Sequence, residues 1–261
     1  MNFLVTNDDG IFAPGVKALV DVLTNFGKVF VVCPDVENSA ISHSITLRRP
    51  ISVTELSIFD SNQVTSWSIS GTPSDCVKLA LEVLIKEPID IVFSGINMGS
   101  NIGRDVFYSG TISAALEAQL FNLPSIALSL DSYNPQETNF TNCKKWLFQF
   151  LREILKKPLN NKVLLNVNFP YVKLDKFKGF KIANLDFSVE RYKHVTIDDS
   201  FGQIFYWLKD CRSTITSDFI DHDFMLIKQG YATITPIQYS FTANDLIDSY
   251  KNELFQNKGE N

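Results

Sequence analysis

The chain of 261 residues lacks several features that would assign a function at once. It has only three histidines, none at a paired-ligand spacing, and no Gly-Lys-Ser or Gly-Lys-Thr of a Walker A loop. Its few cysteines form no Cys-x-x-Cys pair, which argues against a zinc site or a disulfide framework and favours free thiols in a reducing compartment. The four cysteines are Cys33, Cys76, Cys143 and Cys211.

An excess of positive charge is also missing, and so are long hydrophobic runs. Acidic residues outnumber basic ones by 29 to 24, and the pI is about 5.3. No basic field is therefore available to hold duplex nucleic acid, although a bound cation can reverse the local sign for a small anionic substrate. The chain has no apolar stretch of membrane-spanning length and no basic start followed by an apolar run, so we expect a cytoplasmic protein with no membrane partner.

The first half of the chain alternates between strand and helix patterns, which predicts an α/β fold with a doubly wound, mostly parallel sheet. Short apolar runs indicate strands at 2–6, 29–32, 89–93, 124–130 and 163–167. Helical spacing of apolar residues indicates helices at 14–26, 72–84, 111–121 and 141–157. Residues 45–53 and 64–69 are expected to form an extended pair.

The pattern changes after about residue 185, where aromatic and β-branched residues dominate. We interpret this part as a β-rich extension, with a hairpin used for oligomer contacts, followed by a strand at 231–235 and a helix at 242–254. The chain is predicted to be one domain, 1–261, with a core at 1–185, the extension at 186–230, and a returning strand and C-terminal helix at 231–261.

The first strand runs directly into Asn7-Asp8-Asp9-Gly10. Adjacent carboxylates at the carboxyl end of a strand lie where open α/β sheets bind ligands, and they repel each other unless a cation neutralises them. Gly10 permits the sharp turn that directs both acids into one crevice. The same tripeptide is often only a turn or a helix cap, so alone it leaves the metal site open.

Two further oxygen-bearing side chains follow other predicted strands, Ser39 and Asn97. With Asp8 and Asp9 they would form an all-oxygen ligand set, which suits Mg²⁺ or Mn²⁺ better than zinc. Taken singly, Ser39 is an ordinary loop hydroxyl and Asn97 a turn former, and only convergence at one sheet edge would make them ligands.

A glycine-rich stretch at 94–103 precedes Tyr108-Ser109-Gly110-Thr111 at a predicted helix start. Glycines let backbone amides approach a ligand, and a helix N-terminus favours an anion, so phosphate is the natural guest. The alternative is a flexible loop before a capped helix. His43 could donate a proton to a leaving group, but a lone loop histidine is more often solvated, and Arg104-Asp105 is interpreted as a surface pair.

These motifs resemble those of the SurE family of survival proteins, which are metal-dependent 5′/3′-nucleotidases. The resemblance extends over most of the chain. The matching segments are 4–10, 71–81, 94–103, 108–111, 165–170 and 230–236.

The resemblance implies metal ligation by Asp8, Asp9, Ser39 and Asn97, with one divalent cation, Mg²⁺ or Mn²⁺, per subunit. It implies phosphate contacts from Asn101 and from 109–111. It further implies a Rossmann-like core, and a C-terminal segment exchanged within a homodimer or homotetramer. The chain departs from the family at Glu37-Asn38-Ser39-Ala40, where the family has an Arg-Ser-Gly-like run, so any electrostatic help from a basic residue there is lost.

The function predicted from these residues is hydrolysis of nucleoside 5′-monophosphates by metal-activated attack at phosphorus. Asp8 and Asp9 are the candidate catalytic residues, and the sequence leaves open whether water or Asp9 attacks. It also leaves open the cleavage of 3′-nucleotides and short polyphosphates.

Two rival functions remain. An aspartyl-phosphate phosphatase of the haloacid dehalogenase kind would need Asp-x-Asp, whereas residue 10 here is glycine. A non-catalytic nucleotide sensor would keep the glycine-rich loop and bind without a divalent ion.

Overall fold

A computed structural model describes residues 1–211, 216–240 and 242–255. Within them, nine strands form one sheet in the order β3-β4-β2-β1-β5-β6-β7-β11-β8. The pairs are parallel except β3 with β4 and β7 with β11, which confirms the predicted α/β fold with a mostly parallel, doubly wound sheet. The strands are β1 (Asn2–Thr6), β2 (Lys28–Pro34), β3 (Val53–Leu56), β4 (Val64–Ile69), β5 (Ile91–Met98), β6 (Ser125–Asp131), β7 (Leu164–Pro170), β8 (Phe180–Ile182) and β11 (Ala232–Ile237).

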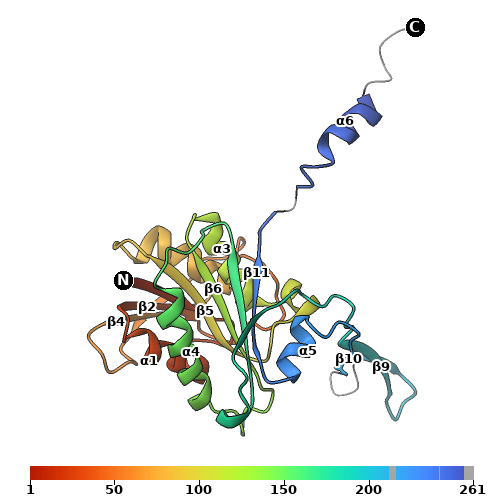
Figure 1. Ribbon diagram of the computed structural model, residues 1–261, viewed down its shortest axis with the longest axis horizontal. Coiled ribbons are helices and arrows are strands. Elements are labelled where there is room, and N and C mark those ends of the chain that lie inside the picture. Colours follow the sequence, from red (N-terminus) through yellow and green to blue (C-terminus); the bar gives the residue numbers. More distant parts are fainter. Residues whose placement is uncertain (212–215, 241, 256–261) are drawn as a thin grey trace.

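Helices cover both faces of this sheet, because alternate side chains of each buried strand point to opposite faces. From β1, Phe3 and Val5 join the core under α1 (Pro14–Leu23) and α4 (Thr141–Ile154). Leu4 joins the core under α2 (Pro73–Leu79) and α3 (Gly110–Leu120). Figure 1 shows α1 and α4 side by side over one part of the sheet. The carboxyl ends of β1, β2, β5 and β6 are thereby left uncovered for a ligand.

Sequence signals explain where several helices begin. Proline occupies the first turn of α1, where its missing N–H costs nothing. The side chain of Thr72 accepts from the backbone of Asp75, and the Asp75 carboxylate accepts from the backbone of Thr72, which is a capping box for α2. After Leu79 the helix continues as a π-helical turn, η1 (Ala80–Leu84). The shorter helices are η2 (Gly103–Phe107), η3 (Leu174–Lys176), α5 (Asp223–Lys228) and α6 (Ile247–Phe255).

Several sequence-based boundaries were wrong, among them the helix end expected at 26, which lies at Leu23, and the helix start expected at 242, which lies at Ile247. The expected strand at 45–53 is present only from Val53 onward, because Pro50 has no N–H for a ladder and the preceding chain is instead held by the Asp75 carboxylate at the backbone of Thr46. The helix expected to reach 157 ends at Ile154. The expected polar loop after residue 96 contains the end of β5 and the 3₁₀ helix η2, so Asn97 is a strand residue.

The part of the chain after β8 contains a separate antiparallel hairpin of β9 (Tyr192–Asp198) and β10 (Ile204–Asp210), which stands apart from the main sheet (Figure 1). All seven residues of β10 are exposed, including Phe205 and Trp207. The helix α5, which the sequence patterns did not predict, packs against β11 and β7. The C-terminal helix α6 projects away from the body of the molecule (Figure 1), and the final predicted residues, 256–261, lie outside the described residues.

No helix in the described part of the chain is long and apolar enough to cross a membrane. The cytoplasmic location stays a prediction.

Candidate functional site

Side chains from four loops and strand ends meet at the carboxyl edge of the sheet, around a cavity of about 170 Å³. Asp8 follows β1, Ser39 follows β2, and Asn97 lies at the end of β5. Asn101 and Ser109 complete the predicted residues that line this cavity. Asp9, Gly110 and Thr111 do not line the cavity but adjoin residues that do, Asp9 through Met98, and Gly110 and Thr111 through Asp8. The structure therefore brings all of the predicted site residues to one place.

Asp8 is held against the N-terminus of α3. Its carboxylate Oδ1 accepts from Thr111 Oγ1 at 2.5 Å, and its side chain is almost fully buried. A Cβ on Gly110 would lie 2.8 Å from the Asp8 Cβ, so only glycine permits this approach. Burial raises the pKa of Asp8, while the hydrogen bonds from Thr111 oppose the shift. Thr111, predicted to contact phosphate, therefore serves Asp8 through its hydroxyl.

Asp9 is the second acid of the pair. Burial, and then the charge of Asp8, raise the pKa of Asp9 to about 7 from an ordinary value of 3.8. The backbone N–H of Met98 donates to its Oδ2 at 3.3 Å and opposes the shift only in part. Within the described ranges, no lysine, arginine or histidine lies at ion-pair distance from Asp8 or Asp9. The pair is therefore two carboxylates without a protein cation.

The Ser39 loop adds negative charge to this site. Ser39 Oγ donates to Glu37 Oε1 at 2.6 Å, and the charge of Glu37 contributes to the raised pKa of both Asp8 and Asp9. Ala40 has a φ of +56°, in the left-handed region that favours glycine. The segment 37–40 thus adds an acid to the surroundings of Asp8 and Asp9, and it places alanine in a conformation that favours glycine.

Asn97 is held by a hydrogen bond within its own turn, and Asn101 by hydrogen bonds to the neighbouring strands β6 and β7. Asn97 Nδ2 donates to the Gly99 carbonyl at 2.7 Å, which leaves the amide oxygen as the atom for a cation. Asn101 Nδ2 donates to Ser129 Oγ at 2.9 Å. The backbone N–H of Asn101 also donates to Asn168 Oδ1 at 2.8 Å. The pairing of β5 with β6 shifts register between Ser94 and Asn97, which re-aims the strand end toward the cavity.

The residues present fit a hard divalent cation. The available donors are carboxylate, hydroxyl and amide oxygens, as Mg²⁺ and Mn²⁺ prefer. No group of three histidine, cysteine or acidic side chains suited to a metal occurs in the residues that the structure describes, which disfavours a zinc-type site. A cation here would offset the repulsion and desolvation that raise the pKa of Asp8 and Asp9.

The start of α3 provides the anion side of the cavity. Ser109 is its N-cap, and Ser109 Oγ accepts from the backbone of Ile112 at 3.2 Å. Helix α3 spans eleven residues, so its N-terminal amides carry a partial positive charge next to the acid pair. The geometry thus places the amides of a helix start beside the oxygen-bearing side chains that the sequence predicts as ligands.

Other residues considered from the sequence lie elsewhere. His43 Nε2 is 2.8 Å from Glu117 Oε2 on α3, and His43 does not line the cavity. The interpretation of Arg104 and Asp105 as a surface pair was wrong. Asp105 is buried and pairs with Arg191 at 2.6 Å, whereas Arg104 donates to the Phe187 carbonyl at 2.7 Å.

Sequence reasoning missed the residues that close the cavity from the far side, Tyr133, Arg191 and Tyr192. Arg191 is the only Lys, Arg or His among the described residues that line it. Arg191 and Tyr192 belong to the stretch that we assigned to packing and subunit contacts, and no spacing in one sequence marks them as neighbours of Asp8.

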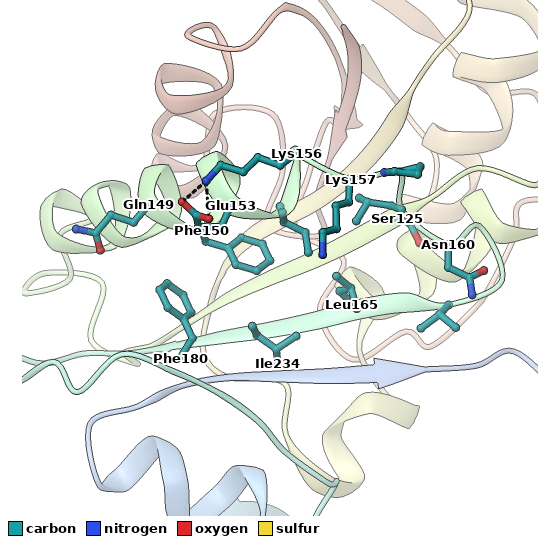
Figure 2. A pocket seen from close by; sticks show the side chains of 14 residues that line it. Ser125, Gln149, Phe150, Glu153, Lys156, Lys157, Asn160, Leu165, Phe180 and Ile234 are labelled. Carbon is teal, nitrogen blue, oxygen red and sulfur yellow. Dashed lines mark hydrogen bonds and ion pairs between the residues drawn. The ribbon is translucent and has the colours of Figure 1, made fainter.

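A larger groove, of about 790 Å³, lies between α4, β7, β8 and β11 (Figure 2). It is lined mainly by apolar side chains, with the Lys156–Glu153 ion pair on its α4 side (Figure 2). None of the predicted site residues lines it, so its size does not make it the candidate site.

The fold and the site together define an open α/β protein. It holds an acid pair and a helix N-terminus at the carboxyl edge of its sheet, where such folds bind ligands. Residues 3–191 match the family model described as Survival protein SurE. A 5′-nucleotidase SurE of Trichodesmium erythraeum is 43% identical over 254 residues, with 93% of each chain covered. A 5′-nucleotidase SurE of Synechococcus sp. is 39% identical, covering 95% of this chain and 96% of the relative.

The chain accordingly belongs to the SurE family. The crystal structure of a SurE protein from Aquifex aeolicus has the same fold, with a TM-score of 0.82 and 31% identity. That similarity covers 97% of this chain and 99% of the other.

Replacement of Thr111 by valine should weaken cation binding. Thr111→Val removes the hydroxyl that donates to Asp8, and such a bond to a charged group contributes about 1.5–3 kcal/mol, so the Kd for Mn²⁺ should rise roughly tenfold or more. Thr111→Ser keeps the hydroxyl and should stay close to wild type. Calorimetric titration measures both, and equal affinities for the valine and serine variants would contradict this role.

Cation binding should also depend on pH. Protons compete with the cation for Asp9, whose pKa is about 7, so the Kd for Mn²⁺ should rise about tenfold for each unit below that pH. Because the folded pKa lies above the unfolded value of 3.8, protonation of Asp9 favours folding at low pH. The metal-free protein should lose that contribution as pH rises from about 4 to about 7. Melting curves with chelator and with Mn²⁺ test this, and a pH-independent effect of Mn²⁺ would be the contrary result.

Proposed function

We propose that this protein is a metal-dependent 5′-nucleotidase that hydrolyses nucleoside 5′-monophosphates to nucleoside and phosphate. The observation that supports it most is the adjacent pair of Asp8, which lines the cavity beside the N-terminus of α3, and the half-buried Asp9, with no basic side chain of the described residues at ion-pair distance from either. The relatives described above are named 5′-nucleotidase SurE, which agrees with this substrate class.

In this proposal Asp8, Asp9, Ser39 and Asn97 hold one divalent cation, Mg²⁺ or Mn²⁺. When bound, the cation supplies charge neutralisation at the phosphoryl group and lowers the pKa of a water molecule. Ser39 would have to turn its hydroxyl away from Glu37 to offer a lone pair to the ion. Asn97 already has its amide oxygen unengaged in the described contacts.

The remaining residues hold the phosphate and move the proton. Asn101, Ser109, Gly110 and the amides at the start of α3 bind the phosphate oxygens as charge develops on them. Asp8 accepts a short bond of 2.5 Å from Thr111, whereas Asp9 accepts only a longer one of 3.3 Å from the backbone of Met98, so Asp9 is the carboxylate better placed to accept a proton from the attacking water. Direct attack by Asp9 on phosphorus is the alternative. Cleavage of 3′-nucleotides and short polyphosphates is the wider form of the same proposal, because both present a terminal phosphate to the site.

Replacement of the acid pair should abolish the activity. We expect Asp8→Asn combined with Asp9→Asn to lower phosphate release from adenosine 5′-monophosphate by a factor of about 10³ or more, because neither the cation nor the proton is then held. The matched control, Asp60→Asn, removes an exposed carboxylate far from the cavity and should leave turnover unchanged. Full activity in the double variant would refute the proposal.

The rival functions are separated by the same assay. A nucleotide sensor would bind the nucleotide with chelator present and release no phosphate. An aspartyl-phosphate enzyme would accumulate a phosphorylated Asp8 or Asp9, which mass analysis of the quenched reaction would detect.

We further propose that the protein forms a homodimer or homotetramer. Apolar side chains of β10 are exposed on a hairpin outside the main sheet, and α6 extends away from the body with Ile247, Tyr250 and Leu254 exposed. Exposed apolar surface of this extent marks protein contacts. Light scattering at micromolar concentration should give two or four times the chain mass of 29.5 kDa, with Trp207→Ser shifting the distribution toward smaller species. A monomer at all concentrations would contradict this.

A further inference from the structure

One positively charged side chain that lines the cavity, Arg191, comes from outside the strand–helix core. Arg191 lies directly before β9, and its side chain is only 10% exposed. It lines the same cavity as Asp8, Asn97 and Asn101. Nothing in the predicted ligand or phosphate sets includes this residue, so its contacts decide what it contributes.

Arg191 forms charged hydrogen bonds with two carboxylates. Its Nη1 lies 2.6 Å from Asp105 Oδ2, and its Nη2 and Nε lie 2.6 and 3.0 Å from Asp210 Oδ2. Burial lowers the pKa of the guanidinium, but the hydrogen bond with Asp210 and nearby negative charge more than offset this and raise it overall. Because two carboxylates neutralise one guanidinium, its net charge is not free to attract a phosphate. What Arg191 contributes to the site is therefore mainly the fixed geometry of its hydrogen bonds.

The Asp105 contact leads to the phosphate side of the site. The backbone carbonyl of Asp105 accepts from the N–H groups of Tyr108 at 3.0 Å and Ser109 at 3.1 Å. Asp105 thus closes the turn that presents Ser109 and begins α3. By holding the Asp105 carboxylate, Arg191 fixes this turn from outside the core.

A second contact leads to the metal side. The guanidinium carbon lies 4.7 Å from the centroid of the Tyr133 ring and 5.1 Å from that of Tyr192. The Tyr133 hydroxyl accepts from the backbone N–H of Ser100 at 2.8 Å and lies 2.7 Å from Ser100 Oγ. Ser100 lies between Asn97 and Asn101, so the stacked Tyr133 ring supports the loop that carries both asparagines.

We propose that Arg191 is a positioning residue that sets the geometry of the phosphate cradle, acting through Asp105 on the turn before α3 and through Tyr133 on the loop after β5. This inference rests on the proposed function and deepens it. Arg191, at the start of the β9–β10 hairpin, would then be part of the site. A lysine cannot reproduce the role, since it lacks the planar fork that pairs two carboxylates and stacks on two rings.

The test compares Arg191→Ala and Arg191→Lys with wild type. The readouts are the affinity for inorganic phosphate, by calorimetry with saturating Mn²⁺, and kcat and KM for adenosine 5′-monophosphate. We expect Arg191→Ala to weaken phosphate binding and raise KM tenfold or more, with a smaller rise in the Kd for Mn²⁺ that comes through the loop carrying Asn97. Arg191→Lys should be intermediate, and it keeps the inference testable if the alanine variant fails to fold.

The variant Asp105→Asn distinguishes a positioning role of the Arg191–Asp105 pair from a purely electrostatic effect on phosphate binding. If the residues acted only by charge, removal of a negative group near the cavity would strengthen phosphate binding. Positioning requires the opposite sign, so we expect Asp105→Asn to weaken phosphate binding at least fivefold. Melting temperatures of each variant verify that the fold is retained.

Arg104→Ala is the matched control. Arg104 is also an arginine of this region that bonds to the extension, through Phe187 and Glu190, but it does not line the smaller cavity. It should stay within twofold of wild type in all readouts. Wild-type affinity and KM in folded Arg191→Ala or Arg191→Lys, or tighter phosphate binding in Asp105→Asn, would overturn this inference alone. No turnover by the wild-type protein with Mg²⁺ or Mn²⁺ would instead overturn the proposed function.

Discussion

The contact between Asp8 and the first turn of α3 is the constraint on which the rest of the site depends. The carboxylate lies so close to Gly110 that a single methyl group at that position would displace it, and Thr111 holds one of its oxygens. This contact fixes the end of β1 to the start of α3, so the acid pair and the anion-binding helix terminus cannot move independently. A cation and a phosphate bound there would therefore meet at a set separation, as phosphoryl transfer requires.

This arrangement stores unfavourable electrostatics in the metal-free protein. Asp8 and Asp9 are buried near Glu37, and the described residues offer them no basic partner. Glu37, two residues before Ser39, adds to the local negative charge. A cation bound there would offset this charge, which no basic side chain of the described residues neutralises at ion-pair distance. The burial of the two carboxylates, which is unfavourable without an ion, is thus the same feature that would favour binding of a divalent ion.

The hairpin extends this picture beyond the core. A segment rich in exposed apolar residues begins with a buried arginine that contacts Asp105 in the turn before α3, and Tyr133, which in turn holds Ser100. Asp210, at the end of β10, holds the same arginine, so the two strands of the hairpin are joined at the cavity wall. Any contact that the exposed face of the hairpin makes with another subunit would therefore involve the same element that holds Arg191 at its base.

The sequence by itself determined the α/β class, the family resemblance and the residues at the carboxyl edge, because each signal is local. An apolar strand followed by Asp8-Asp9-Gly10, or a capped helix start at Ser109, is legible within a few residues. It did not determine that Thr111 supports Asp8, or that Asp105 pairs with Arg191 and not with its neighbour Arg104. These partners are separated by 103 and 86 positions in the chain. Only the packing of α3 and the hairpin against the sheet brings them within hydrogen-bonding distance, and no local pattern encodes that approach.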